Sequence, residues 1–117
     1  MAMELGIDIE QNERFKDISE KFKQRAFTPS EIEYAEKRAN KHQVYCSFWC
    51  VKESVVKAFS NRSLEFQQIN ILATPEGRPY IELNDTIKQE LEKLGMSEIK
   101  ISISNAKDYS TAVCIIN

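Results

Sequence analysis

The hydrophobic pattern changes its period along the chain, and each change marks a predicted element. Over 4–9, apolar residues alternate with polar or small ones, which predicts a strand whose second face carries Gly6 and Asp8. Because glycine has no side chain, Gly6 leaves room for a ligand to approach Asp8 closely. Over 12–24, apolar residues recur at spacings of three and four, which predicts a short amphipathic helix.

Two further helices follow in the first half of the chain. Thr28 before Pro29, with Glu31 at the third position, is a strong helix start, and this helix is expected to run to about Asn40. A polar stretch then precedes a long helix over 44–59, whose apolar residues fill about half of its circumference.

The second half of the chain predicts shorter elements, which together with the first half describe an α+β domain over 1–117. They are a strand within 64–72, a turn at Glu76-Gly77, a return strand over 78–83, a helix that Asn84 or Asp85 caps and Gly95 ends, and an antiparallel hairpin of strands over 99–104 and 109–116.

Composition limits the class of protein. The 117 residues, with 42% hydrophobic and 29% charged, suffice for one core and are typical of a folded domain. No apolar run approaches the roughly 20 residues of a membrane span, and no signal peptide opens the chain, so we expect a cytoplasmic protein without a membrane partner. We therefore expect Cys46, Cys50 and Cys114 to be reduced thiols.

The formal net charge of -2 conceals a basic segment over 14–25, with five basic and two acidic residues, a local balance of +3. One basic segment on an acidic chain argues against general binding of nucleic acid, which needs a broad positive footprint. It is compatible with an acidic protein partner, and equally with a solvated helix face that has no partner.

Two carboxylates form the main candidate site. Asp8 on a strand and Glu53 on the long helix predict a Mg²⁺ site, since this ion is usually held by one or two carboxylates while phosphates and waters complete its coordination. Lys57 lies one helical turn beyond Glu53, at the same border of the apolar stripe. Lys52 falls in the middle of the stripe, where it must snorkel, find a counter-ion or reach an anion in a cleft.

In these features the chain resembles the 4'-phosphopantetheinyl transferases, specifically the small holo-[acyl-carrier-protein] synthase type. The resemblance spans nearly the whole length. Trp49-Cys50-Val51-Lys52-Glu53-Ser54-Val55-Val56-Lys57-Ala58-Phe59 is similar to the family's W/F-x-x-K-E-x-x-x-K-A-F signature. Gly6-Ile7-Asp8-Ile9, Gly77-Arg78-Pro79-Tyr80 and the triplet Ser102-Ile103-Ser104 before the last strand match other family elements in order.

The resemblance implies the fold of that family, an antiparallel sheet with a long central helix. It also implies Mg²⁺-dependent transfer of the phosphopantetheine arm of coenzyme A to a serine of an acyl carrier protein, with release of 3',5'-ADP. Family members of this size form homotrimers with active sites between subunits. By motif position, Asp8 and Glu53 would hold Mg²⁺, and these two with Lys57 would carry catalysis. Coenzyme A would meet Lys52, Lys57, Ser60, Asn61, Arg62, Arg78, Pro79, Ser104 and Asn105. The carrier protein would meet Arg14, Lys21, Phe22 and Arg25.

Two departures from the family pattern leave alternatives open. The family's glycine-rich loop after K-A-F is replaced by Ser60-Asn61-Arg62-Ser63, which is shorter and lacks glycine. Asn105 stands where the family commonly has histidine, so a metal-bound water, Glu53 or a water-mediated route must activate the serine. A degenerate member that binds coenzyme A or a carrier protein without transfer is the alternative, and a mere trimer-building subunit is a weaker one.

Overall fold

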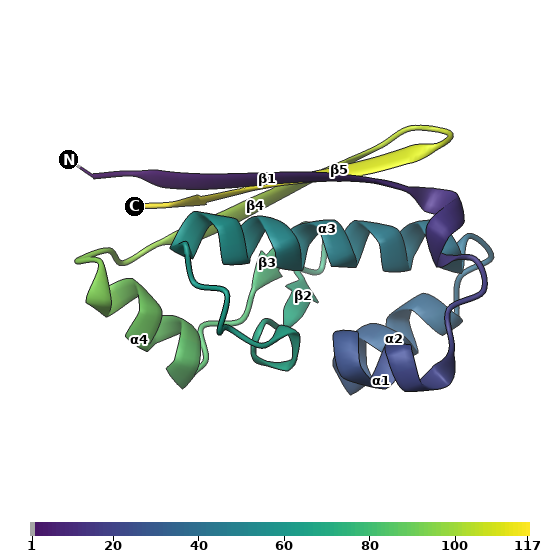
Figure 1. Cartoon of the computed structure of the whole chain (residues 1–117), viewed down its shortest axis with the longest axis horizontal. Helices are drawn as coiled ribbons and strands as arrows, with labels where there is room; N and C mark the ends of the chain where they lie inside the picture. The colour runs from purple at the N-terminus through teal and green to yellow at the C-terminus, as the bar shows by residue number, and fades with distance from the viewer. Residues whose placement is uncertain (1) are drawn as a thin grey trace.

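The chain folds into three layers around one long helix (Figure 1). A computed structural model describes residues 2–117. The strands are β1 (Glu4–Gln11), β2 (Ile71–Ala73), β3 (Pro79–Ile81), β4 (Ile99–Asn105) and β5 (Tyr109–Ile116), and the α-helices are α1 (Glu20–Ala26), α2 (Pro29–Glu36), α3 (Lys41–Phe59) and α4 (Asp85–Lys93). A sheet of three strands forms the first layer and α3 the second, and the third layer holds the other helices with the small β2–β3 hairpin.

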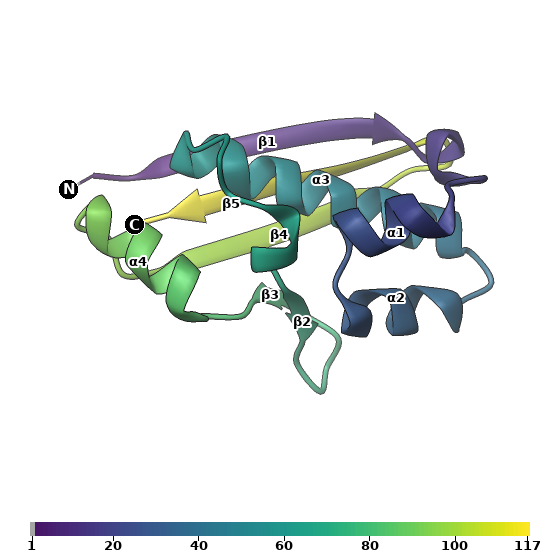
Figure 2. The ribbon, with the colours of Figure 1, turned by 60° about the horizontal axis from the view of Figure 1, so that its bottom comes forward.

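The larger sheet is antiparallel, in the order β1-β5-β4 (Figure 2). Alternation turns Gly6 and Asp8 of β1 towards α3, whereas Leu5, Ile7 and Ile9 point to the outer face and are about 60% exposed. No element within residues 2–117 covers that outer face. The edge strand β1 therefore presents a row of uncovered apolar side chains on the outer face of the sheet.

Helix α3 supplies the centre of the core. It begins three residues earlier than predicted, at Lys41, and its middle positions Cys46, Cys50, Val51 and Val55 are fully buried. One face packs on the inner face of the sheet, and the other packs on the third layer. This double burial explains the wide apolar stripe of the sequence.

The predicted helix starts are confirmed at two sites. Thr28 and Glu31 form a reciprocal capping box at α2, and the Asn84 side chain accepts a hydrogen bond from the backbone N–H of Ile87 at α4. Helix α2 ends at Glu36, four residues before the predicted Asn40.

The prediction of one helix over 12–24 is wrong. A short 3₁₀ helix, Asn12–Phe15, is separated from α1 by a break at which Ser19 caps the new helix. The Ser19 hydroxyl accepts the backbone N–H of Phe22 at 3.1 Å, so a local hydrogen bond restarts the chain and overrides the apolar periodicity.

The predicted strand within 64–72 is also wrong over most of its length. Only its end joins β2, while Phe66–Gln68 forms a 3₁₀ helix. The backbone carbonyls of Phe66 and Ile69 accept hydrogen bonds from the buried ammonium of Lys52, which directs this backbone towards α3 instead of a neighbouring strand.

Glu36, the last residue of α2, contacts side chains of two other helices. Its carboxylate accepts the Tyr45 hydroxyl at 2.6 Å and contacts the ammonium groups of Lys23 and Lys41 at 3.0 and 3.1 Å. These contacts, with the Tyr45 hydrogen bond the largest, lower the pKa of Glu36 to about 2. The ionised carboxylate therefore ties α1 to α2 and α3.

The three cysteines, Cys46, Cys50 and Cys114, are buried and unpaired in the described part of the chain. Among the helices of residues 2–117, none has the length and apolar character needed to cross a membrane.

Gly6 marks the closest approach of β1 to α3. A Cβ atom built at Gly6 would lie 2.1 Å from the carbonyl oxygen of Ser54 and 2.7 Å from the backbone nitrogen of Ala58. The expected space for a ligand at Gly6 is therefore filled by the helix backbone, and this part of the prediction is wrong. The glycine instead lets the strand rest directly on the helix.

We predict that Gly6→Ala lowers the free energy of unfolding by about 3 kcal/mol, because the clash is with backbone atoms that cannot rotate away. Chemical denaturation of both proteins measures the difference. Gly77→Ala is the matched control: a Cβ there meets no atom within 4 Å and only the positive φ of 89° is strained, so its cost is about 1 kcal/mol. Equal effects of the two substitutions would contradict the close-packing explanation.

Candidate functional site

The contact of β1 with α3 places Asp8 beside Lys57. The ammonium of Lys57 donates to Asp8 Oδ1 at 3.1 Å and to the backbone carbonyl of Ile7 at 2.9 Å. The second carboxylate oxygen, Asp8 Oδ2, is buried and has no hydrogen-bond partner. A buried, unpartnered carboxylate oxygen is costly, and it is the kind of atom that a bound cation satisfies.

Glu53 lies one turn before Lys57 on the same helix and is half-buried. Burial raises the pKa of Glu53, and the negative charge of Asp8 raises it further, while the cations Lys57 and Arg62 act in the opposite direction. The two carboxylates are therefore close enough for their charges to interact, and the cations near them are Lys57 and Arg62. Of the two lysines expected beside the carboxylates, Lys57 is there and Lys52 is not.

These residues fit a Mg²⁺ ion. The observation that supports the fit is the unpartnered Oδ2 of Asp8 beside a second carboxylate whose charge is disfavoured without a counter-ion. In residues 2–117, no group of three or more His, Cys, Asp and Glu side chains is arranged to hold a metal. A cation here would depend on two carboxylates, with phosphate or water oxygens as its other ligands.

The glycine-free segment after α3 turns through Ser60. This residue adopts the left-handed conformation, with φ 53° and ψ 37°, which is the conformation that glycine usually supplies at a helix end. The Asn61 side chain then donates to Glu90 of α4 at 2.7 Å and accepts the backbone N–H of Ser63 at 3.0 Å. The Asn61 amide is thus engaged within the protein, and Arg62 is exposed.

A second group of predicted residues lines a cavity of about 850 Å³ between α2, the first half of α3, the β2–β3 hairpin and β4. Arg78, Pro79 and Asn105 lie in its wall. Ser104 does not line this cavity. A cavity of this size, whose wall combines apolar side chains with several polar and charged ones, is suited to a small molecule that carries both kinds of group.

Tyr34 and Arg38 also line this cavity, although neither was predicted from the sequence to belong to a site. The guanidinium of Arg38 lies 3.6 Å from the centre of the Tyr34 ring, a cation–π contact across one turn at the end of α2. The i, i+4 spacing of an aromatic residue and an arginine was the available signal.

Asn105 is held by serine hydroxyls. Its amide nitrogen donates to Ser47 Oγ and Ser110 Oγ, both at 2.7 Å. Both amide hydrogens are therefore used inside the protein, and the group has no basic nitrogen with which to remove a proton.

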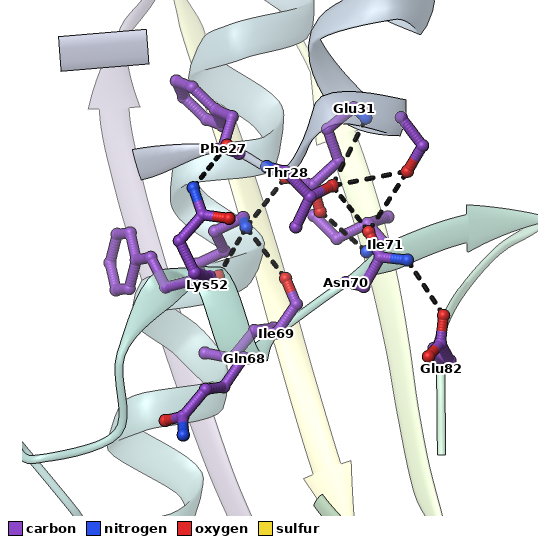
Figure 3. Close-up of polar contacts among 12 residues, drawn as sticks. Phe27, Thr28, Glu31, Lys52, Gln68, Ile69, Asn70, Ile71 and Glu82 are labelled. Carbon is purple, nitrogen blue, oxygen red and sulfur yellow. Dashed lines mark hydrogen bonds and ion pairs between the residues drawn. The ribbon is translucent and has the colours of Figure 1, made fainter. Parts of the chain in front are cut away.

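Lys52 must be reassigned. It is fully buried, with its ammonium 2.8 Å from Glu31 Oε1 and 2.8 Å from each of the carbonyl oxygens of Phe66 and Ile69 (Figure 3). The three hydrogens of the ammonium thus face three protein oxygens. Of the three options for Lys52, the counter-ion is the correct one, and its assignment as a coenzyme A ligand is wrong.

The basic segment is not one helix, and its basic side chains are exposed except that of Lys23, which is buried and paired with Glu36. Arg14 is 64% exposed and pairs with Glu10 at 2.6 Å, and Lys21 and Arg25 are exposed on α1. Phe22 is half-buried, with its ring centre 5.6 Å from that of Trp49, so it anchors α1 to α3.

The predicted site residues therefore form two groups at opposite edges of the sheet. Asp8 lies on β1 and Asn105 on β4, with β5 between them (Figure 2). Helix α3 carries Glu53 and Lys57 near the first group and Ser47 near the second. One copy of the chain does not bring the two groups together.

Comparison with known proteins agrees with this fold. A sequence model of the 4'-phosphopantetheinyl transferase superfamily matches residues 4–114. A holo-[acyl-carrier-protein] synthase of Ruminiclostridium cellulolyticum is 37% identical, over 100% of this chain and 93% of that protein. The structure of the Neisseria meningitidis holo-[acyl-carrier-protein] synthase has a TM-score of 0.86 at 22% identity, with 97% of each chain covered. That of the Helicobacter pylori synthase in complex with coenzyme A has a TM-score of 0.80 at 25% identity, covering 97% of this chain and 99% of that one.

The interaction of Asp8 with Glu53 generates a prediction that needs no substrate. Asp8→Asn removes the neighbouring negative charge, so the pKa of Glu53 should fall towards its usual value, with the burial contribution remaining. Carbon-13 NMR titration of the glutamate carboxyl groups measures this shift. Asp17→Asn, on the exposed break before α1, is the control and should leave the pKa of Glu53 unchanged. An unchanged pKa in Asp8→Asn would show that the two carboxylates do not form one site.

Proposed function

The chain belongs to the 4'-phosphopantetheinyl transferase superfamily, and on that premise we propose that it is a holo-[acyl-carrier-protein] synthase. It transfers the 4'-phosphopantetheine arm of coenzyme A to a serine of an apo acyl carrier protein. The serine oxygen bonds to the phosphorus of the arm, the bond from that phosphorus to the bridging oxygen breaks, and 3',5'-ADP leaves. The observation that carries the proposal is the Asp8–Glu53 pair with its unpartnered buried oxygen beside Lys57.

In this proposal Asp8 and Glu53 hold the metal ion. Bound there, Mg²⁺ would neutralise charge on the diphosphate of coenzyme A. Lys57, which Asp8 and the Ile7 carbonyl hold in place, is 42% exposed and adds a fixed positive charge for the same diphosphate. Arg62 contributes a further cation from the segment after α3.

Glu53 is our candidate for the group that takes the serine proton, directly or through water. With Mg²⁺ bound, the carboxylate of Glu53 would stay ionised and would accept a hydrogen bond from the serine or from a water beside it. Asn105 has no basic nitrogen, so it cannot take this role.

The cavity at the other edge of the sheet is proposed to hold the nucleotide part of coenzyme A. Arg78 and Arg38 offer cations to phosphate groups, and Pro79 and Tyr34 offer flat apolar surfaces to a base. The segment after α3 keeps the left-handed turn that glycine usually supplies, with Ser60 in its place.

We propose a homotrimer with its active sites between subunits. Two features support a second copy at the sheet: the two site groups lie at opposite edges, and Leu5, Ile7 and Ile9 form an uncovered apolar row. A neighbouring copy would cover that row and bring its cavity to the Asp8 edge. Native mass spectrometry tests this assembly, and a mass of one copy under assay conditions would contradict it.

The carrier protein is proposed to dock on the basic segment, with Arg14, Lys21 and Arg25 as exposed cations and Phe22 as a partly exposed apolar contact.

The absence of paired cysteines among the described residues is compatible with the proposed location in the cytoplasm.

Incubation of the protein with coenzyme A, Mg²⁺ and apo carrier proteins tests the proposed function. Mass spectrometry should show that the carrier gains one phosphopantetheine. Asp8→Ala and Glu53→Ala should each lower kcat/KM by about 10²-fold or more, because each removes a carboxylate that would hold the ion neutralising the diphosphate. Glu92→Ala, an exposed position of α4, is the control and should be neutral.

Two outcomes of that assay contradict different parts of the proposal. An unmodified carrier, together with measurable binding of coenzyme A, would favour the binding protein without transfer. Normal rates in either carboxylate variant at low Mg²⁺ would show that the metal assignment is wrong.

We predict that Arg14→Glu with Arg25→Glu raises the KM for the carrier protein by about tenfold or more and leaves the KM for coenzyme A nearly unchanged. The wild-type rate should fall with added salt, and the rate of the variant should respond less. Lys37→Glu with Lys88→Glu changes the net charge equally at other exposed positions and serves as the control. If both double variants behaved alike, net charge and not a docking surface would explain the effect.

A further inference from the structure

The buried ion pair of Lys52 and Glu31 lies outside the proposed chemistry and calls for an explanation. Both side chains are 0% exposed, and Lys52 Nζ lies 2.8 Å from Glu31 Oε1. Burying two charges is expensive even when they are paired, so such a pair contributes little to stability compared with apolar residues of similar volume. What it can supply is a fixed geometry between the segments that it joins.

On the lysine side, the pair holds the segment that leads into β2. Besides Glu31, Lys52 Nζ donates to the carbonyl oxygens of Phe66 and Ile69, both at 2.8 Å. These carbonyls belong to chain that forms no ladder of its own before Ile71. The ammonium thus replaces the strand partner that this backbone lacks.

On the glutamate side, the pair holds the first residue of β2. Glu31 Oε2 accepts the backbone N–H of Ile71 at 2.7 Å, and Oε1 accepts the backbone N–H of Thr28 at 2.9 Å as part of the α2 capping box. One carboxylate therefore links the start of α2, the middle of α3 and the start of β2 (Figure 3).

The segment that is held in this way has little support from its own pairing. The β2–β3 hairpin has only three residue pairs, and a two-stranded hairpin of this length is marginal by itself. It nevertheless carries Arg78 and Pro79 into the wall of the cavity. The position of these two residues depends on the anchors at the base of the hairpin.

We propose that Lys52 is a positioning residue for the nucleotide cavity. Through Glu31 and the carbonyls before β2, it fixes the hairpin on α3 and so sets where Arg78 and Pro79 meet the ligand. The identity of that ligand as coenzyme A rests on the proposed function.

The direction in which Glu31→Gln changes the affinity for coenzyme A separates this role from direct binding of a phosphate by Lys52. If Lys52 bound the anion, Glu31 would compete for its ammonium, and Glu31→Gln would strengthen binding of coenzyme A. If the pair positions the hairpin, Lys52→Met and Glu31→Gln both weaken binding. Lys52→Met keeps most of the stem and removes the charge, and Glu31→Gln keeps the shape.

Calorimetry with coenzyme A measures the effect. We expect each single variant to raise Kd by about tenfold, equivalent to about 1.4 kcal/mol, and the double variant to be no weaker than the worse single one. In an Arg78→Ala background, Lys52→Met should raise Kd by only about twofold, because Lys52 acts through Arg78. Lys88→Met, an exposed lysine of α4, is the control and should leave Kd unchanged.

Steady-state kinetics add a readout that general destabilisation does not produce. Lys52→Met should raise the KM for coenzyme A while kcat at saturating coenzyme A, and the KM for the carrier protein, change by less than about twofold. Two results would overturn the proposal. One is tighter binding of coenzyme A in Glu31→Gln. The other is that Lys52→Met raises Kd as much in the Arg78→Ala background as it does in the wild-type protein.

Hydrogen exchange of the wild-type protein keeps the test valid if the variants do not fold. The Ile71 amide should be protected far more strongly than the Thr74 amide, which closes the hairpin at its turn end by bonding the Arg78 carbonyl at 2.9 Å. Equal, weak protection of both amides would overturn the proposal. If the wild-type chain bound no coenzyme A, the proposed function would fail, whereas this exchange pattern would still decide whether the buried pair holds the hairpin.

Discussion

The direct contact of β1 with α3 is the constraint on which the candidate site depends. The strand rests on the helix at Gly6, where the Ser54 carbonyl leaves no room for a Cβ atom. Because this contact fixes the height of the strand above the helix, Asp8, two residues on, is brought against Lys57 and near Glu53. A strand held one side-chain layer higher would place its carboxylate too far from the helix to share a cation with Glu53.

Two lysines of α3 show how the same side chain acquires different roles from its surroundings. Lys57 lies at the border of the apolar stripe and is partly exposed, so its charge remains available to a ligand. Lys52, five residues earlier, points into the protein, where oxygens of α2 and of the segment before β2 surround it. The apolar stripe of the helix already indicates part of this difference, because Lys52 lies in its middle and Lys57 at its border. The oxygen partners of each ammonium depend on what packs against that face of the helix.

Much of the fold followed from the sequence where local signals agreed with tertiary packing. The Thr28 capping box, the long helix and the final hairpin were predicted because period and caps are local properties. The segment 64–72 was misread because its backbone bonds to Lys52, which is distant in sequence. Within the site, the apolar stripe indicated that Lys52 needs a partner and the i, i+4 spacing was available for Tyr34 and Arg38, whereas the oxygens that surround Lys52 come from segments distant in sequence, which a linear pattern does not identify.

The adjacency of Lys52 and Glu53 on α3 restricts how the length of this chain can vary. Successive side chains on a helix differ by about 100° in direction. Lys52 therefore points towards the β2–β3 hairpin, while Glu53 points towards Asp8. A one-residue insertion between Lys41 and Lys52 would turn both side chains out of phase with their partners at once. A change of length is therefore tolerated better outside this helix, for example in the turns before Lys41 and after Phe59, where it leaves the rotational setting of α3 intact.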